Sequence, residues 1–165
     1  MKIVKEKRYM MNRGILLLIS LGIIFLLIQC EDDPCEENLD TPVGVTFHTI
    51  DTNGVKQDVS ITALSVYAQD NDSIIADSSL NVHELKLPLN PHKDSSMFIL
   101  DADSLQDSIT FLYTHDKEFV SQDCGFKLVY ELDTIISTEH FIDSLNIIQN
   151  TVNKSDENHL EIFVL

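Results

Sequence analysis

The chain has 165 residues, with 11 basic and 27 acidic residues and a formal net charge of -16. This acidity argues against nucleic-acid binding, because nucleic-acid binders present a basic surface to phosphates. It also argues against adsorption to an anionic lipid surface by charge alone. The part after residue 29 is long enough for one domain with its own hydrophobic core.

The first 29 residues have the pattern of an export signal. Basic residues are concentrated at the start, and an apolar stretch of about 15 residues follows from Gly14 to Ile28. A membrane-spanning helix needs ~20 apolar residues, so this stretch is short for a span. The sequence therefore predicts a signal peptide over residues 1–29.

The apolar stretch ends at Leu27-Ile28-Gln29-Cys30, which resembles the lipobox of bacterial lipoproteins. The resemblance implies that the Cys30 thiol carries a diacylglycerol and that the chain is cut before it. Gln29 departs from the lipobox pattern, which prefers a small residue there, and an uncleaved anchor helix is the alternative. Acyl chains contribute ~0.8 kcal/mol per buried CH2, so several of them would hold the protein at a membrane.

An acidic trio, Glu31, Asp32 and Asp33, follows the cysteine directly. It resembles the surface-export signal of lipoproteins in Bacteroidota, which implies a position on the outer leaflet of the outer membrane. The periplasmic face is the alternative, with the trio serving only as a solvated linker. We expect residues 30–41 to form a lipidated acidic tether.

Two further cysteines, Cys35 and Cys124, remain if Cys30 is lipidated. An even pair in an exported chain predicts a disulfide, and two free buried thiols are the alternative. Closing a loop of about 90 residues would stabilise the fold by ~4–5 kcal/mol in the chain-entropy model. Neither cysteine has a nearby Cys or His at ligand spacing, so no metal site is predicted there.

From Pro42 onward, apolar and polar residues alternate in short runs, which is the pattern of half-buried strands. Turn residues separate the runs, notably Asp51-Thr52-Asn53-Gly54 and Thr114-His115-Asp116. The apolar run from Met97 to Leu100 predicts a strand buried on both faces, and Phe141 to Val152 fits either a helix or strands. The other expected strands lie near residues 43–47, 59–63, 64–66, 74–75, 85–89, 109–113, 126–132 and 160–164.

This pattern predicts an all-β domain over residues 42–165. Short strands with regular turns and no long helix favour an antiparallel β-sandwich of immunoglobulin-like architecture. A β-barrel is the alternative.

Several short motifs occur in a recognisable order: Cys30 to Cys35, Thr41-Pro42 before a strand, Asp123-Cys124-Gly125-Phe126, and a final strand from His159-Leu160. Together they resemble a family of small Bacteroidota lipoproteins that is classed as a domain of unknown function. The resemblance implies the anchor, the paired cysteines and a β-rich domain. It implies no reaction.

The acidic turns are the candidate cation sites. Asp51-Thr52-Asn53-Gly54 has part of a calcium-loop pattern but lacks the closing glutamate, so a plain turn is favoured. Asp70-Asn71-Asp72 and Asp101-Ala102-Asp103 could each hold a weak cation. The sequence has no Gly-x-Ser-x-Gly turn and no His-Glu-x-x-His helix. We therefore predict no catalytic residue, metal or cofactor.

One short pattern recurs, an aspartate followed by a hydroxyl residue and an aliphatic residue. It is similar to the O-glycosylation acceptor pattern of exported Bacteroidota proteins, and the alternative is ordinary turn-to-strand patterning. The acceptors would be Ser73, Ser104, Ser108, Thr134 and Ser144.

These features predict a non-catalytic accessory or interaction module of the cell envelope. It would be anchored to the outer membrane through Cys30 and would contact an envelope protein. A cation- or glycan-binding surface module is the alternative, and a hydrolase is the least favoured function.

Overall fold

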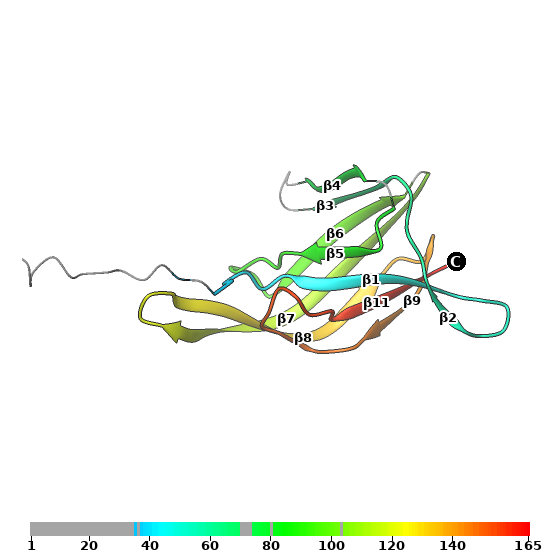
Figure 1. Cartoon of the computed structure of the whole chain (residues 1–165). Coiled ribbons are helices and arrows are strands. Elements are labelled where there is room, and N and C mark those ends of the chain that lie inside the picture. The colour runs from blue at the N-terminus through cyan, green and yellow to red at the C-terminus, as the bar shows by residue number, and fades with distance from the viewer. Residues whose placement is uncertain (1–34, 36, 70–73, 80, 103) are drawn as a thin grey trace, which may run out of the picture. The chain divides into compact units, whose positions relative to one another are not determined.

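The computed structural model describes residue 35 and residues 37–69, 74–79, 81–102 and 104–165 (Figure 1). The expected signal peptide, Cys30 and the acidic trio lie outside these residues. The chain divides into two units, Met1–Cys35 and Glu36–Leu165, and the fold described below is that of the second unit. Within the described segments, no helix is long and apolar enough to cross a membrane.

The described residues form eleven strands, and the all-β prediction is confirmed. The strands are β1 (Val43–Ile50), β2 (Lys56–Asp58), β3 (Leu64–Ala68), β4 (Ile74–Ser79), β5 (Glu84–Leu87), β6 (Ser95–Ala102), β7 (Leu105–Ser121), β8 (Gly125–Ser137), β9 (Ile142–Ile147), β10 (Thr151–Val152) and β11 (Leu160–Val164). One sheet has the order β2-β1-β11-β9, with β5 also paired to β1. The other sheet has the order β10-β8-β7-β6-β3-β4.

The two sheets share one hydrophobic core. Val45 and Phe47 of β1 are buried in it, and so are Ile109 and Phe111 of β7 in the other sheet. These residues are spaced two apart because alternate side chains of a strand point to the same face. The sheets therefore pack as the two layers of a sandwich-like domain.

One strand pair differs from the predicted antiparallel arrangement. β1 and β11 run parallel, with Val45 opposite Leu160 and Phe47 opposite Ile162, and they lie side by side in Figure 1. Parallel strands need a crossover connection. The connection between β1 and β11 passes through the second sheet, which holds β3, β4, β6, β7, β8 and β10. The prediction of an antiparallel sandwich is confirmed for the other strand pairs of the described residues and was wrong for this pair.

The hairpin of β7 and β8 contains a segment that the sequence predicts as a turn but that forms a strand. The stretch Thr114-His115-Asp116 lies inside β7, where Thr114 is opposite Glu131 and Asp116 is opposite Val129 of β8. Cross-strand pairing decides the conformation here, because strand preference depends strongly on such context. The turn end of this hairpin projects past the neighbouring strands (Figure 1), since β6 pairs with β7 only between Leu105 and Leu112.

Two other expectations also need correction. The run from Met97 to Leu100 is not buried on both faces: Phe98 and Leu100 point into the core, while Met97 and Ile99 are only half-buried. Residues 59–63 form no strand, because the chain crosses between the sheets there. Ala63, at the end of this stretch, has a φ of 55°. The ambiguous stretch 141–152 forms β9 and β10 rather than a helix.

A buried carboxylate fixes the crossing from β8 to β9 between the two sheets. Asp107 of β7 is only 1% exposed. It accepts hydrogen bonds from the backbone N–H groups of His140, Phe141 and Ile142 and from the Thr138 hydroxyl, at 2.6–3.0 Å. Burial alone raises the pKa of Asp107, but the Thr138 hydroxyl and the three N–H groups outweigh it and lower the pKa to about 2. Asp107 thus stays ionised and holds the turn between β8 and β9.

Candidate functional site

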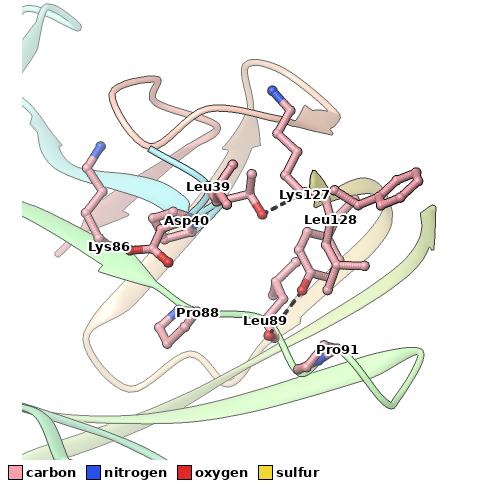
Figure 2. A pocket seen from close by; sticks show the side chains of 12 residues that line it. Leu39, Asp40, Lys86, Pro88, Leu89, Pro91, Lys127 and Leu128 are labelled. Carbon is pink, nitrogen blue, oxygen red and sulfur yellow. Dashed lines mark hydrogen bonds between the residues drawn. The ribbon is translucent and has the colours of Figure 1, made fainter. Parts of the chain in front are cut away.

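A groove of about 560 Å³ lies beside the first residues of the domain (Figure 2). We call it the tether groove, because residues 39–42, which precede β1, form one side. Pro88, Leu89 and Pro91 of the β5–β6 connection form another side, and residues 126–128 and Tyr130 of β8 complete it. Pro88 lacks an N–H donor, so β5 ends before it and the connection stands apart from the sheet.

The polar groups at the floor of the tether groove are already hydrogen-bonded. The Tyr130 hydroxyl donates to the Leu89 carbonyl oxygen at 3.5 Å, and the Thr41 hydroxyl donates to the Leu128 carbonyl oxygen at 2.9 Å (dashed lines in Figure 2). Burial raises the pKa of Tyr130, so its phenol stays protonated. The Tyr130 ring also packs edge-on against Tyr113, with centroids 5.4 Å apart. The floor is therefore a pre-formed surface for contact.

The lysines at the rim are neutralised by nearby carboxylates. Lys127 Nζ lies 3.7 Å from Glu37 and 4.0 Å from Glu118, and Lys86 Nζ lies 2.7 Å from Glu84. The two lysine side chains extend from the groove in Figure 2. Because these charges are compensated, the groove offers shape and apolar surface rather than a strong electrostatic site.

Two exposed aromatic side chains stand next to this groove. Phe119 of β7 and Phe126 of β8 are directly opposite each other near the hairpin turn. They are 56% and 62% exposed, and their rings meet edge to face with centroids 5.3 Å apart. Phe126 also lines the tether groove. We call these two residues the hairpin-tip pair.

The hairpin-tip pair was missed at the level of sequence. The alternation of Phe126, Leu128, Tyr130 and Leu132 predicts one inward-facing row, yet only Tyr130 and Leu132 are buried. The pair could have been predicted from the two phenylalanines that flank Cys124-Gly125, because these two residues lie at the turn of the hairpin. Gly125 has a φ of 74°, so this turn requires its glycine.

Cys35 and Cys124 are both disulfide-bonded. This agrees with the disulfide that we predict from the two cysteines that remain if Cys30 is lipidated. The Cys124 N–H also donates to the Ser121 hydroxyl at 2.9 Å, which fixes the hairpin turn locally.

The suggested glycan acceptors do not gather in one place. Ser104 is exposed in the turn between β6 and β7, while Thr134 and Ser144 are exposed within β8 and β9. Ser108 is half-buried in β7 between two paired strands, which limits access to its hydroxyl. Ser73 lies outside the described residues.

The acidic turns show no sign of a cation site where they are described. Asp51 Oδ1 accepts from the N–H of Asn53 at 2.8 Å and from the N–H of Val55 at 2.9 Å. The Val55 N–H, followed by the Asn53 N–H, lowers the pKa of Asp51. These bonds are those of a plain turn. Across the described segments, no three His, Cys, Asp or Glu side chains gather as a metal site. Residues 70–72 and Asp103 lie outside those segments.

Comparisons with known proteins identify a family but no close relative. No curated protein and no solved structure matches the chain. The model of a family of unknown function, DUF6452, matches residues 63–164, which is more than half of the chain. The matched part runs from just before β3 to the end of β11 and includes the β7–β8 hairpin. The chain therefore belongs to the family of unknown function DUF6452.

Proposed function

We propose that this protein is a lipid-anchored module of the cell envelope that works by binding a partner protein rather than by catalysis. The export pattern of residues 1–29 and the lipobox-like end at Cys30 support the anchor. The acidic trio after Cys30 supports a position on the outer surface of the outer membrane in a bacterium of the Bacteroidota.

The hairpin-tip pair is the observation that carries the binding function. Large aromatic side chains are enriched at protein interfaces and often supply most of the binding energy. Phe119 and Phe126 are mostly exposed and lie opposite each other near the turn of the β7–β8 hairpin, and this turn end projects past the neighbouring strands (Figure 1). The tether groove beside Phe126 has a pre-formed floor whose polar groups are already hydrogen-bonded, so a partner that covers both phenylalanines can also place a side chain in the groove.

We propose an immunoglobulin-like arrangement only in the broad sense of two packed sheets. The shared core between the sheets supports it. The consecutive strands β6, β7 and β8 lie in one sheet, whereas a constant-type immunoglobulin domain places at most two consecutive strands in the same sheet.

The test is capture of a partner from detergent-solubilised membranes with two matched double variants. Phe119→Ser with Phe126→Ser removes the hairpin-tip pair, while Leu105→Ser with Ile136→Ser removes two exposed apolar side chains near the other end of the same strands. We expect a specific partner with the native protein and the control, and its loss with the hairpin-tip variant at unchanged melting temperature. Equal recovery with both variants, or no specific partner at all, would overturn the proposal.

A further inference from the structure

We propose that the tether groove takes a proline-rich segment of the partner protein, and that an arginine of this segment pairs with Asp40. The segment belongs to the same partner as in the proposed function, on which this inference rests. The hairpin-tip pair requires only an apolar surface on the partner. The groove also has a charge and a restricted set of hydrogen-bonding groups, so it selects the chemistry of what enters it.

Asp40 is the charged side chain of the groove that has no opposite charge beside it. The three charged residues of the lining are Asp40, Lys86 and Lys127. Each lysine has a carboxylate nearby, at 2.7 Å for Lys86 and at 3.7 Å for Lys127. Asp40 is exposed and forms no ion pair with any described residue, and Figure 2 shows the Lys86 ammonium group pointing away from it. A cation of a partner can therefore pair with Asp40 without displacing an existing ion pair.

Asp40 is held in place although it is exposed. The Asp40 N–H donates to Asn38 Oδ1 at 2.9 Å, and Asn38 Nδ2 in turn donates to the Ser155 hydroxyl at 2.8 Å. On the other side of Asp40, the Thr41 hydroxyl donates to the Leu128 carbonyl oxygen at 2.9 Å. A partner that binds a segment fixed in this way loses less conformational entropy than one that must order a mobile segment.

The charges around the groove favour a basic partner. The charged lining residues and their ion-pair partners comprise four carboxylates and two ammonium groups, so their net charge is -2. They are Asp40, Glu37, Glu84, Glu118, Lys86 and Lys127. The whole chain has a net charge of -16. Such a field raises the local concentration of cationic groups and speeds the encounter with a basic surface.

An arginine fits this position better than a lysine does. A guanidinium donates to both oxygens of one carboxylate, and its flat face packs on aromatic rings. The Phe126 ring lines the same groove as Asp40 and is 62% exposed, so it offers such a face. A lysine ammonium is a compact, strongly hydrated charge that gains less from a neighbouring ring.

The backbone of the groove has few hydrogen-bonding groups to offer. Pro42, Pro88 and Pro91 line it and have no N–H. The two carbonyl oxygens at the floor already accept from side-chain hydroxyls. A partner that binds by adding a β-strand needs a row of such groups. A polyproline II segment has no such need, because it docks on apolar and aromatic grooves through its rings.

The first experiment compares four blocked peptides on the full protein in detergent, by fluorescence anisotropy of a labelled peptide end. They are Pro-Pro-Arg-Pro-Pro, the same peptide with citrulline or with glutamate in place of arginine, and Ala-Ala-Arg-Ala-Ala. Citrulline keeps the shape of arginine but has no charge, and the alanine peptide keeps the charge but lacks the polyproline II conformation. We expect saturable binding of the arginine–proline peptide, about threefold to tenfold tighter than that of any other. Equal binding of another peptide, or no saturable binding of this one, would overturn the proposal.

Two matched variants test the role of Asp40. Asp40→Asn removes the charge and keeps the size and the backbone contact, whereas Asp133→Asn removes an exposed carboxylate of β8 outside the groove. We expect Asp40→Asn to weaken the arginine–proline peptide about threefold to tenfold, the range of a well-formed exposed ion pair. The difference from the native protein should shrink at high salt, and Asp133→Asn should bind like the native protein. Unchanged binding by Asp40→Asn at an unchanged melting temperature would contradict the site.

The single variant Phe119→Ser separates this proposal from the hairpin-tip contact, because Phe119 does not line the groove. We expect it to reduce capture of the partner protein and to leave peptide binding unchanged. Capture of a partner without binding of the arginine–proline peptide would remove the proline-rich segment and keep the hairpin-tip contact. Peptide binding that Asp40→Asn weakens, with a partner whose capture ignores Phe119, would remove the hairpin-tip contact and keep the ligand of the groove.

Discussion

Gly44 and His159 exchange two hydrogen bonds where β1 meets the start of β11. The Gly44 N–H donates to Nδ1 of His159 at 3.0 Å, and the His159 N–H donates to the Gly44 carbonyl oxygen at 2.8 Å. His159 is completely buried. A Cβ atom on Gly44 would lie 2.1 Å from the carbonyl oxygen of Glu157. The two segments can approach this closely only because residue 44 has no side chain.

Replacing this glycine should therefore be costly. We expect Gly44→Ala to destabilise the domain by about 1–3 kcal/mol or more through overpacking against backbone, measured by urea denaturation. Gly54→Ala is the control, because the position has open space around it and only the strain of a φ of 79°. Equal losses of stability for the two variants would show that the close contact at Gly44 is unimportant.

The Asp107 carboxylate should give the domain a distinct loss of stability in acid. Its folded pKa of about 2 lies below the ordinary value of 3.8, because the hydrogen bonds from Thr138 and the three N–H groups outweigh burial. As the pH falls, the unfolded chain therefore takes up the proton at a higher pH than the folded chain does. Asp107 contributes ~2 kcal/mol to the free energy of unfolding above about pH 4, and this contribution is lost as the pH falls toward 2. This loss is checked by measuring the melting temperatures of the native protein and of Asp107→Asn from neutral pH down to about pH 2. The variant should be less stable at neutral pH and flatter in acid, and parallel curves would contradict the role of Asp107.

His159 should act in a separate and milder pH range. Burial lowers its pKa, so the folded state keeps the ring neutral while the unfolded chain protonates at its ordinary value of 6.5. The free energy of unfolding therefore falls as the pH drops below about 6.5, because the unfolded state then binds more protons than the folded state. His159→Gln keeps an acceptor for the Gly44 N–H but cannot titrate. We expect this variant to lose the slope just below pH 6.5 and to retain the acid transition of Asp107, as followed by urea denaturation at several pH values.

Intact mass spectrometry of the protein from its native membrane checks the anchor and the bridge together. We expect a chain that begins at Cys30, carries acyl chains, and gains the mass of two hydrogens on reduction of the Cys35–Cys124 disulfide. Further mass in sugar-sized steps would indicate glycans on the Asp-Ser and Asp-Thr sites. A chain that still contains residues 1–29 would instead show that Gln29 prevents cleavage.

The local patterns of the sequence predict the strand content well. The alternation at Val43, Val45 and Phe47, and that at Ile109, Phe111 and Tyr113, places these side chains in the core, where the structure also has them. A period of two is a local property, so it can be read from neighbouring residues.

Features that depend on distant pairing could not be predicted. The parallel register of β1 and β11 arises from a chain crossing that no local pattern encodes. The same limitation explains why Thr114-His115-Asp116 suggested a turn, although β8 holds it as a strand. A pocket of about 430 Å³ is lined by Thr46 and His48 of β1 and by Asp58 and Glu161 of two other strands, and only the i, i+2 pair on β1 is visible as a local pattern.

The parallel pairing of β1 with β11 also has a consequence for the order in which the domain folds. Val45 and its partner Leu160 are separated by most of the domain's length, and contacts between such distant residues slow folding. A chain that emerges with its N-terminus first cannot complete the first sheet until β11 has followed. We therefore expect the first sheet to close only after the last strand of the domain has been synthesised.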